Sequence, residues 1–110
     1  MIYGILKSAA VIGVTVWSFN QAMAADAAAG RTKAQQCSVC HGIDGIARQP
    51  DAPNIGGESA IYLRRQLDAF RAGERSHEQM TVIAQGLSEE DMADIIAWYS
   101  SLEVIVTVPN

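Results

Sequence analysis

The sequence has few basic residues, only two cysteines and no apolar run long enough to cross a membrane, and each scarcity limits what the protein can do. Its 8 Lys and Arg residues are outnumbered by 12 Asp and Glu residues, which gives a net charge of −4. Nucleic-acid binding depends on clustered basic side chains that neutralise phosphates, so the acidic excess argues against it. The same excess suggests that any protein partner docks through a basic or largely apolar surface.

The N-terminal apolar stretch, Ala9 to Phe19, is 11 residues long and follows Lys7. A membrane-spanning helix needs about 20 such residues, whereas a secretory signal needs fewer. The small-x-small sequence Ala22-Met23-Ala24 then offers a site for signal peptidase. We therefore expect a signal peptide over residues 1–24 and a mature domain over residues 25–110, exported to the periplasm. An uncleaved N-terminal anchor is the alternative, and it would be the chain's only direct membrane contact.

The two cysteines, Cys37 and Cys40, are followed at once by His41. A disulfide across two intervening residues closes too small a loop to stabilise the domain much. A thioredoxin-type site needs a preceding β-rich run, and none is present. A zinc site needs four ligands, and only the distant His77 is available as the fourth.

Cys-x-x-Cys-His is also the attachment motif of c-type haem, and this interpretation requires nothing that the sequence lacks. The two thiols add to the porphyrin vinyl groups, which places the adjacent imidazole under the iron. A domain of this size buries only about 60% of its unfolded surface, so a large apolar cofactor would also stabilise it. We expect one covalently bound haem c, held by Cys37 and Cys40, with His41 as an iron ligand.

The remaining patterns predict a small all-α domain without repeats. Residues 26–36 are mostly good helix formers that lead into the motif, although Gly30 should cost roughly 1 kcal/mol relative to Ala inside a helix. A close helix crossing would explain this glycine, and fraying near a terminus is the alternative. Residues 42–57 are rich in Gly, Pro, Asp and Asn and are expected to form a loop past the haem edge.

Two more helices are expected towards the C-terminus. Between residues 58 and 72, apolar residues recur every three or four positions, and Gly73 ends the pattern. Ser88 is a good N-cap for a last helix, because three acidic residues follow it in the first turn. This helix is expected to reach Leu102, and the β-branched tail, residues 104–108, is expected to form a strand-like flap or a partner contact.

The second iron ligand is not determined by these patterns alone. Met80, Met92 and His77 are the candidates in the expected mature domain. Met92 lies on the apolar face of the expected last helix, where methionine usually fills the core. His77 has polar neighbours and is expected to face solvent. Met80, in a stretch over residues 73–86 that is expected to be irregular, is favoured over His77.

The ordered set of motifs resembles class I cytochrome c, and within it the bacterial cytochrome c4 and c553-like group. The matching segments are Cys37-Ser-Val-Cys40-His41-Gly42, Pro53-Asn54-Ile55-Gly56-Gly57, Tyr62-Leu63, Gln66-Leu67, Phe70-Arg71-Ala-Gly73-Glu-Arg75, Met80, Gly86-Leu87-Ser88 and Trp98-Tyr99. The resemblance covers nearly all of the expected mature chain. It departs from full cytochrome c4 proteins, which carry two such domains, because this chain has one motif.

The resemblance implies further roles. Met80 would be the second axial ligand, and the carbonyl of Pro53 would accept a hydrogen bond from His41 Nδ1, which fixes the imidazole. Gly30 would pack against Trp98. The implied function is electron transfer between redox protein partners, with no enzymatic activity. The alternatives are a haem-bearing subunit of a dehydrogenase or oxidase complex, or a haem enzyme or gas sensor if Met80 is not a firm ligand.

Overall fold

The structure is a computed structural model that describes residue 13 and residues 24–110. The expected signal peptide, residues 1–24, therefore lies outside the described residues apart from Gly13 and Ala24. None of the helices in the described part is long and apolar enough to cross a membrane.

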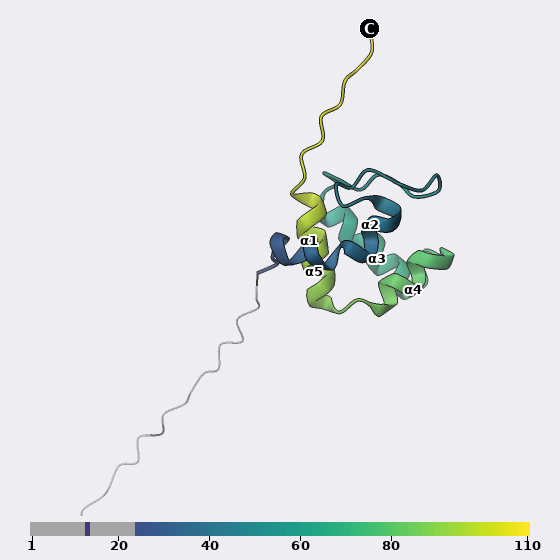
Figure 1. The fold of residues 1–110 in the computed structure, drawn as a ribbon. Helices are drawn as coiled ribbons and strands as arrows, with labels where there is room; N and C mark the ends of the chain where they lie inside the picture. Colours follow the sequence, from purple (N-terminus) through teal and green to yellow (C-terminus); the bar gives the residue numbers. More distant parts are fainter. Residues whose placement is uncertain (1–12, 14–23) are drawn as a thin grey trace, which may run out of the picture.

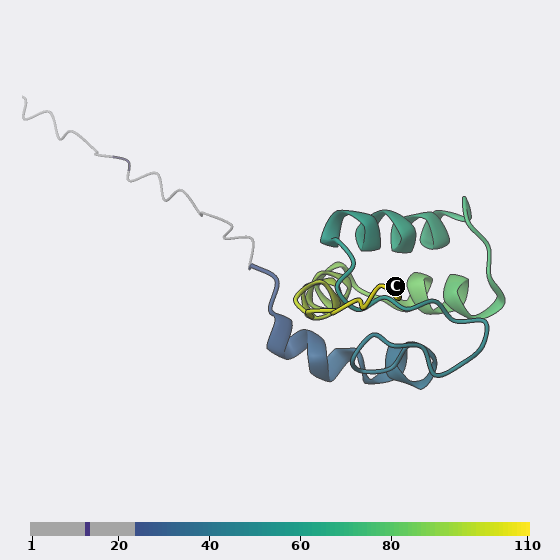
Figure 2. The same cartoon turned by 90° about the horizontal axis from the view of Figure 1, so that it is seen from above.

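Residues 24–110 form five helices and contain no strand, which confirms the all-α prediction. In chain order the helices are α1 (Ala27–Lys33), α2 (Gln35–His41), α3 (Ala60–Ala72), α4 (Glu78–Gly86) and α5 (Glu89–Ser100). α1 packs across α5, and α3 packs against both α4 and α5 (Figure 1). Seen from above, α5 lies between α3 and the α1–α2 pair (Figure 2).

The helix expected over residues 26–36 has different bounds in the structure. α1 begins after Asp26, whose carboxylate accepts hydrogen bonds from two N–H groups of the first turn, and ends at Lys33. The chain bends at the fully buried Ala34, and α2 then contains the whole Cys-x-x-Cys-His motif. The motif is thus itself part of a helix, and that helix follows α1 after a bend.

The stretch over residues 73–86 was expected to be irregular, and this prediction was wrong because the stretch contains α4. Gly73 does end α3, with a φ of 76°. His77 then caps α4, since its Nδ1 accepts hydrogen bonds from two backbone N–H groups, including that of Met80 at 3.3 Å. Residues 81–83 are β-branched and weak helix formers, which obscured the helix in the sequence. The cap and the packing on α3 outweigh that propensity.

Side-chain caps begin the two longer helices. Ser59 accepts a hydrogen bond from the N–H of Tyr62 at 3.1 Å, so α3 starts at Ala60 rather than at residue 58. Ser88 accepts from the N–H of Asp91 at 3.0 Å, which confirms Ser88 as the N-cap of α5. α5 ends at Ser100, two residues before the expected end.

The crossing of α1 and α5 explains Gly30. A β-carbon at this position would lie 1.8 Å from the carbonyl oxygen of Asp94 and 3.1 Å from Cβ of Trp98. Only a residue without a side chain permits this approach. Of the two explanations for the glycine, the close crossing is the correct one.

The core lies along α5. Its buried side chains form one cluster with residues of α3, the α1–α2 bend and the α4–α5 connection: Ala34, Leu63, Leu87, Met92, Ile95, Ile96 and Tyr99. The tail, residues 104–110, leaves the domain as an exposed segment without helix or strand (Figure 1). The strand-like flap expected for it is therefore absent.

Candidate functional site

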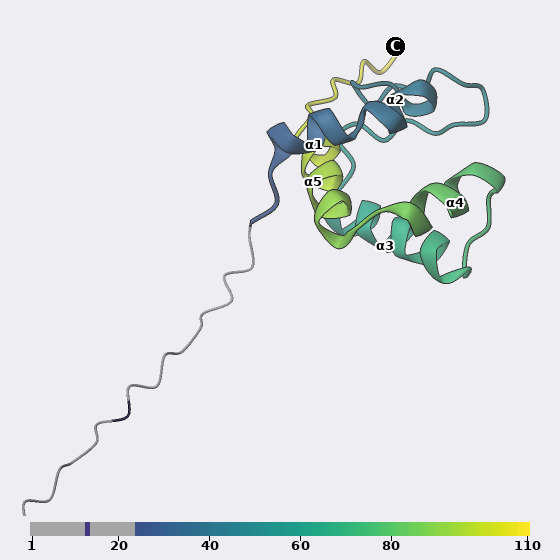
Figure 3. The same cartoon turned by 60° about the horizontal axis from the view of Figure 1, so that its bottom comes forward.

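Residues of α2, α3, α4 and α5, together with the loop between α2 and α3, line a cleft of about 370 Å³. Figure 3 shows how these helices are arranged, with α2 above α4. This volume falls in the range of about 300–1,000 Å³ that is typical of small-molecule and cofactor pockets. Apolar side chains supply much of the lining, including those of Leu63, Leu67, Phe70, Ile83, Ile95 and Ile96. The five residues expected to attach, ligate or orient the haem group, Cys37, Cys40, His41, Pro53 and Met80, all line this one cleft.

The helical form of the motif explains how α2 presents three functional groups together. Cys40 and His41 follow Cys37 by three and four positions, and residues at these spacings share one face of an α-helix. No disulfide joins the two cysteines of the described chain. Burial raises the pKa of Cys37 to about 11, because the charged thiolate is poorly solvated there. A neutral thioether at this position avoids that penalty.

His41 is held in one orientation. Its side chain is buried, and its Nδ1 lies 2.8 Å from the carbonyl oxygen of Pro53. A carbonyl oxygen only accepts hydrogen bonds, so Nδ1 carries the proton. Nε2 of the neutral imidazole is then left with a lone pair, which is the form that ligates a metal.

The backbone directly after His41 is fastened to α5 by two aromatic side chains. The phenol of Tyr99 donates to the carbonyl of Gly42 at 2.9 Å, and the indole N–H of Trp98 donates to the carbonyl of Ile43 at 2.9 Å. Gly42 adopts a φ of 72°, which lets the chain turn sharply from α2 into the loop. The position of His41 is therefore set by α5 as well as by its own helix.

The facing wall of the cleft contains Met80, in the first turns of α4. His77 also lines the cleft, but its Nδ1 is engaged in capping α4, and the residue is exposed. Met92 is fully buried in the core of α5 and does not line the cleft. Of the three candidate second ligands, Met80 is the one with both a cleft position and an uncommitted side chain.

Sequence reasoning missed the residues that hold this site in place. The hydrogen bonds of Trp98 and Tyr99 join positions more than fifty residues apart, and no local sequence pattern predicts such contacts. Arg71 was noted only as part of a motif, although it contacts two backbone carbonyls near the end of α4. The capping role of His77 had one sequence signal, its place directly before Glu78 in a helix that was itself not expected.

The cleft fits a covalently attached haem. It is largely apolar and offers two thiols one helical turn apart, and its single metal-ready imidazole lies on the same face. Within the described residues there is no cluster of three or more His, Cys, Asp and Glu side chains that could hold a bare metal ion. This fold and this site together define a c-type cytochrome.

A sequence model of the family described as Cytochrome c matches residues 27–103, and the chain belongs to this family. It is 51% identical over 83 residues to cytochrome c-554(548) of Halomonas halodenitrificans, with 73% of this chain and 100% of that protein covered. It is 40% identical over 83 residues to cytochrome c4 of Pseudomonas aeruginosa, with 76% of this chain and 41% of that protein covered.

Solved structures give the same result. The reduced recombinant cytochrome c4 from Pseudomonas stutzeri superposes with a TM-score of 0.66 at 36% identity, covering 73% of this chain and 47% of that one. The chain thus spans the whole of the first relative and less than half of these two cytochrome c4 proteins. It is a monohaem electron-transfer protein of class I fold, with one haem c attached through its Cys pair.

Proposed function

We propose that His41 and Met80 are the two axial ligands of the haem iron, and that the protein shuttles electrons between redox proteins of the periplasm. The observation that carries the proposal is that these two side chains line the same cleft from two different helices, His41 from α2 and Met80 from α4. Figure 3 shows these two helices apart from one another. The bound haem supplies the redox chemistry, by alternating between ferric and ferrous iron.

The ligand assignment rests on what the alternatives already do. Met92 is fully buried on α5 and packs in the core, so it would have to leave that core to reach the cleft. His77 accepts two backbone hydrogen bonds at the start of α4, and turning it inward would remove the cap of the helix that carries Met80. Met80 needs no such rearrangement.

Two filled axial positions leave no open site for oxygen or a substrate, which suits a carrier rather than an enzyme. Thioether ligation and an apolar cleft both disfavour the additional positive charge of the ferric state. We therefore expect a relatively positive reduction potential, above that of haems with two histidine ligands.

The proposed location and partners follow from the sequence. Residues 1–24 act as the export signal, and residues 25–110 form the periplasmic domain. Because acidic residues outnumber basic ones, its redox partners are expected to present basic or largely apolar docking surfaces.

Carbon monoxide binding to the reduced protein at neutral pH tests the assignment. The unaltered protein and Met92→Ala should not react, whereas Met80→Ala should keep its covalent haem and bind carbon monoxide readily. Met92→Ala is the matched control, because it truncates the other methionine of the C-terminal half. Rapid and complete binding by the unaltered protein would instead indicate an open iron, as in a gas sensor or haem enzyme. If Met92→Ala opens the iron and Met80→Ala does not, Met80 is not the ligand.

A further inference from the structure

The helix that carries Met80 has few contacts with the other helices of the described chain. Among the helices of the described chain, α4 packs only against α3, and it has no packed contact with α1, α2 or α5. Only Ala84 of its nine residues is fully buried. Apart from a haem in the cleft, this arm, helix α4, therefore relies on its packing against α3 and on polar contacts at its two ends to keep one position.

The most extensive polar contact at the C-terminal end of this arm comes from Arg71, in the last turn of α3. Its Nη2 donates to the carbonyl of Leu87 at 2.9 Å, and its Nε donates to the carbonyl of Ala84 at 3.4 Å. Its Nη1 also pairs with the carboxylate of Glu89, at the start of α5. One guanidinium therefore joins the end of α3, the end of α4 and the beginning of α5.

This contact resembles a helix cap supplied from another helix. The last carbonyls of an α-helix lack partners within the helix, and a cation near them is favoured by the helix dipole. The rigid fork of arginine donates in several directions at once, whereas lysine offers a single charged point. Through these hydrogen bonds Arg71 restricts the position and the direction of the C-terminal end of α4.

We propose that Arg71 is a positioning residue for Met80, acting through α4 and not by contact with the haem. Met80 and Ala84 are four residues apart and lie on the same side of α4, so fixing the carbonyl of Ala84 restricts the displacement of Met80. At the other end of the arm, His77 accepts a hydrogen bond from the N–H of Met80 itself. The inference rests on Met80 being the second axial ligand, as proposed above.

Arg64 provides a matched control two turns earlier on α3. It pairs with the same carboxylate, Glu89, and with Asp68, but it donates to no backbone carbonyl of the α4–α5 connection. Ser59→Ala provides a second control, because it removes the N-cap of α3 and weakens the fold without touching α4. Neither residue lines the cleft.

The experiment compares haem-loaded Arg71→Met, Arg71→Lys, Arg64→Met and Ser59→Ala with the unaltered protein. The fraction of reduced protein that binds carbon monoxide is measured, together with the absorption band of methionine-ligated ferric haem. A lost charged hydrogen bond corresponds to roughly a tenfold to hundredfold change in an equilibrium. We expect a rise of that size in the carbon monoxide-reactive fraction, with a weakened methionine band, for Arg71→Met, and a smaller rise for Arg71→Lys.

The controls decide what a positive result means. Arg64→Met and Ser59→Ala should resemble the unaltered protein, even though thermal unfolding of Ser59→Ala occurs at a lower temperature. Equal reactivity of Ser59→Ala and Arg71→Met at matched stability would overturn the positioning role, since the effect would then follow global stability. If Arg71→Met folds too poorly to load haem, the comparison of Arg71→Lys with Arg64→Met decides, and unchanged ligation in Arg71→Lys counts against the proposal.

Met80→Ala separates this inference from the ligand assignment on which it rests. If Met80→Ala opens the iron and the Arg71 variants do not, the ligand stands and the positioning role fails. If Met80→Ala leaves the iron closed, the ligand assignment itself fails, whatever the Arg71 variants do.

Discussion

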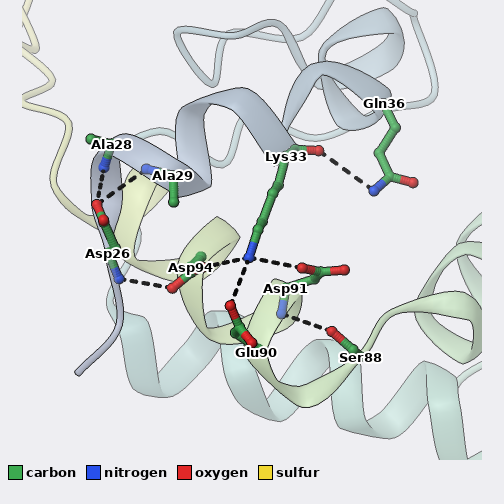
Figure 4. A network of polar contacts seen from close by, with 9 residues as sticks. All are labelled: Asp26, Ala28, Ala29, Lys33, Gln36, Ser88, Glu90, Asp91 and Asp94. Atoms are coloured by element: carbon green, nitrogen blue, oxygen red, sulfur yellow. Dashed lines mark hydrogen bonds and ion pairs between the residues drawn. The ribbon is translucent and has the colours of Figure 1, made fainter. Parts of the chain in front are cut away.

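Lys33 Nζ lies 2.6 Å from Oδ2 of Asp94, and this pair joins α1 to α5 at their crossing (Figure 4). Asp94 is only 4% exposed, and its other oxygen accepts the N–H of Asp26 at 2.8 Å. The same lysine pairs with Asp91 at 2.8 Å and Glu90 at 3.5 Å. A single buried carboxylate therefore ties the beginning of the described domain to its last helix.

We predict that the domain loses stability in acid partly through Asp94. The hydrogen bond from Asp26 N–H and the pairing with Lys33 lower the pKa of Asp94 in the folded state. A depressed folded pKa contributes stability above the unfolded pKa of about 4, and the contribution is lost as pH falls through the folded value. Asp94→Asn should therefore lower Tm at pH 7, with the difference from the unaltered protein shrinking in acid.

Thermal unfolding of the haem-loaded protein at several pH values below 7 measures this convergence. Asp68→Asn is the matched control, because it removes an exposed pair with Arg64 on α3, and such pairs contribute about 0–1 kcal/mol. A difference between Asp94→Asn and the unaltered protein that stays constant with pH would contradict the prediction.

The close approach of α1 to α5 gives a second prediction. Gly30→Ala would place a β-carbon against the backbone of Asp94, which cannot rotate away. We expect the free energy of unfolding to fall by about 1–3 kcal/mol. This loss is larger than the stability that alanine gains over glycine from its higher helix propensity. Gly86→Ala is the control, since a β-carbon there has no neighbour within 4 Å, and its effect should stay within about 1 kcal/mol. Urea unfolding of both variants decides, and equal stabilities would refute the steric account.

The proposed export signal makes a third prediction. The protein recovered from the periplasmic fraction should begin at Ala25, because signal peptidase recognises the small residues Ala22 and Ala24 and cuts after Ala24. Replacing both with leucine should block cleavage and leave residues 1–24 attached. Intact-mass measurement distinguishes the two forms. An unaltered protein that retains Lys7 would support the uncleaved anchor instead.

The features that could be predicted from the sequence depend mainly on residues that are close together in the chain. Ser88 indicated the start of α5, because the N-cap residue and the acidic residues of the first turn are adjacent in the chain. The glycine at position 30 was anomalous enough to indicate a crossing. The cofactor followed from five consecutive residues, 37–41, and membership of the family confirms it.

What could not be predicted depends on contacts between distant segments. α4 was hidden because its β-branched residues oppose helix formation, whereas a histidine cap and packing on α3 stabilise it. The donors from Trp98 and Tyr99 to the chain after His41 exist only once α5 crosses the motif. The assignment of Met80 as a ligand stays a prediction, and its position in the cleft supports it.

The contact between α5 and the motif yields the last prediction, on Tyr99→Phe. Tyr99 is 1% exposed, and its phenol donates to the carbonyl of Gly42, so removing the hydroxyl leaves that carbonyl without this partner. We expect a loss of about 1–3 kcal/mol in the free energy of unfolding near neutral pH, with covalent haem retained.

The pH dependence of this loss identifies its origin. Burial raises the pKa of the Tyr99 phenol above its ordinary value. Because the folded pKa exceeds the unfolded value of about 10, the contribution is complete below that pH and is lost as pH rises towards the folded value. The free energies of unfolding of the unaltered protein and of Tyr99→Phe should therefore become more similar in alkali. Urea unfolding at pH 7 and above pH 10 measures this change. A difference in stability between Tyr99→Phe and the unaltered protein that persists unchanged in alkali would contradict this account of the hydrogen bond to the residue after His41.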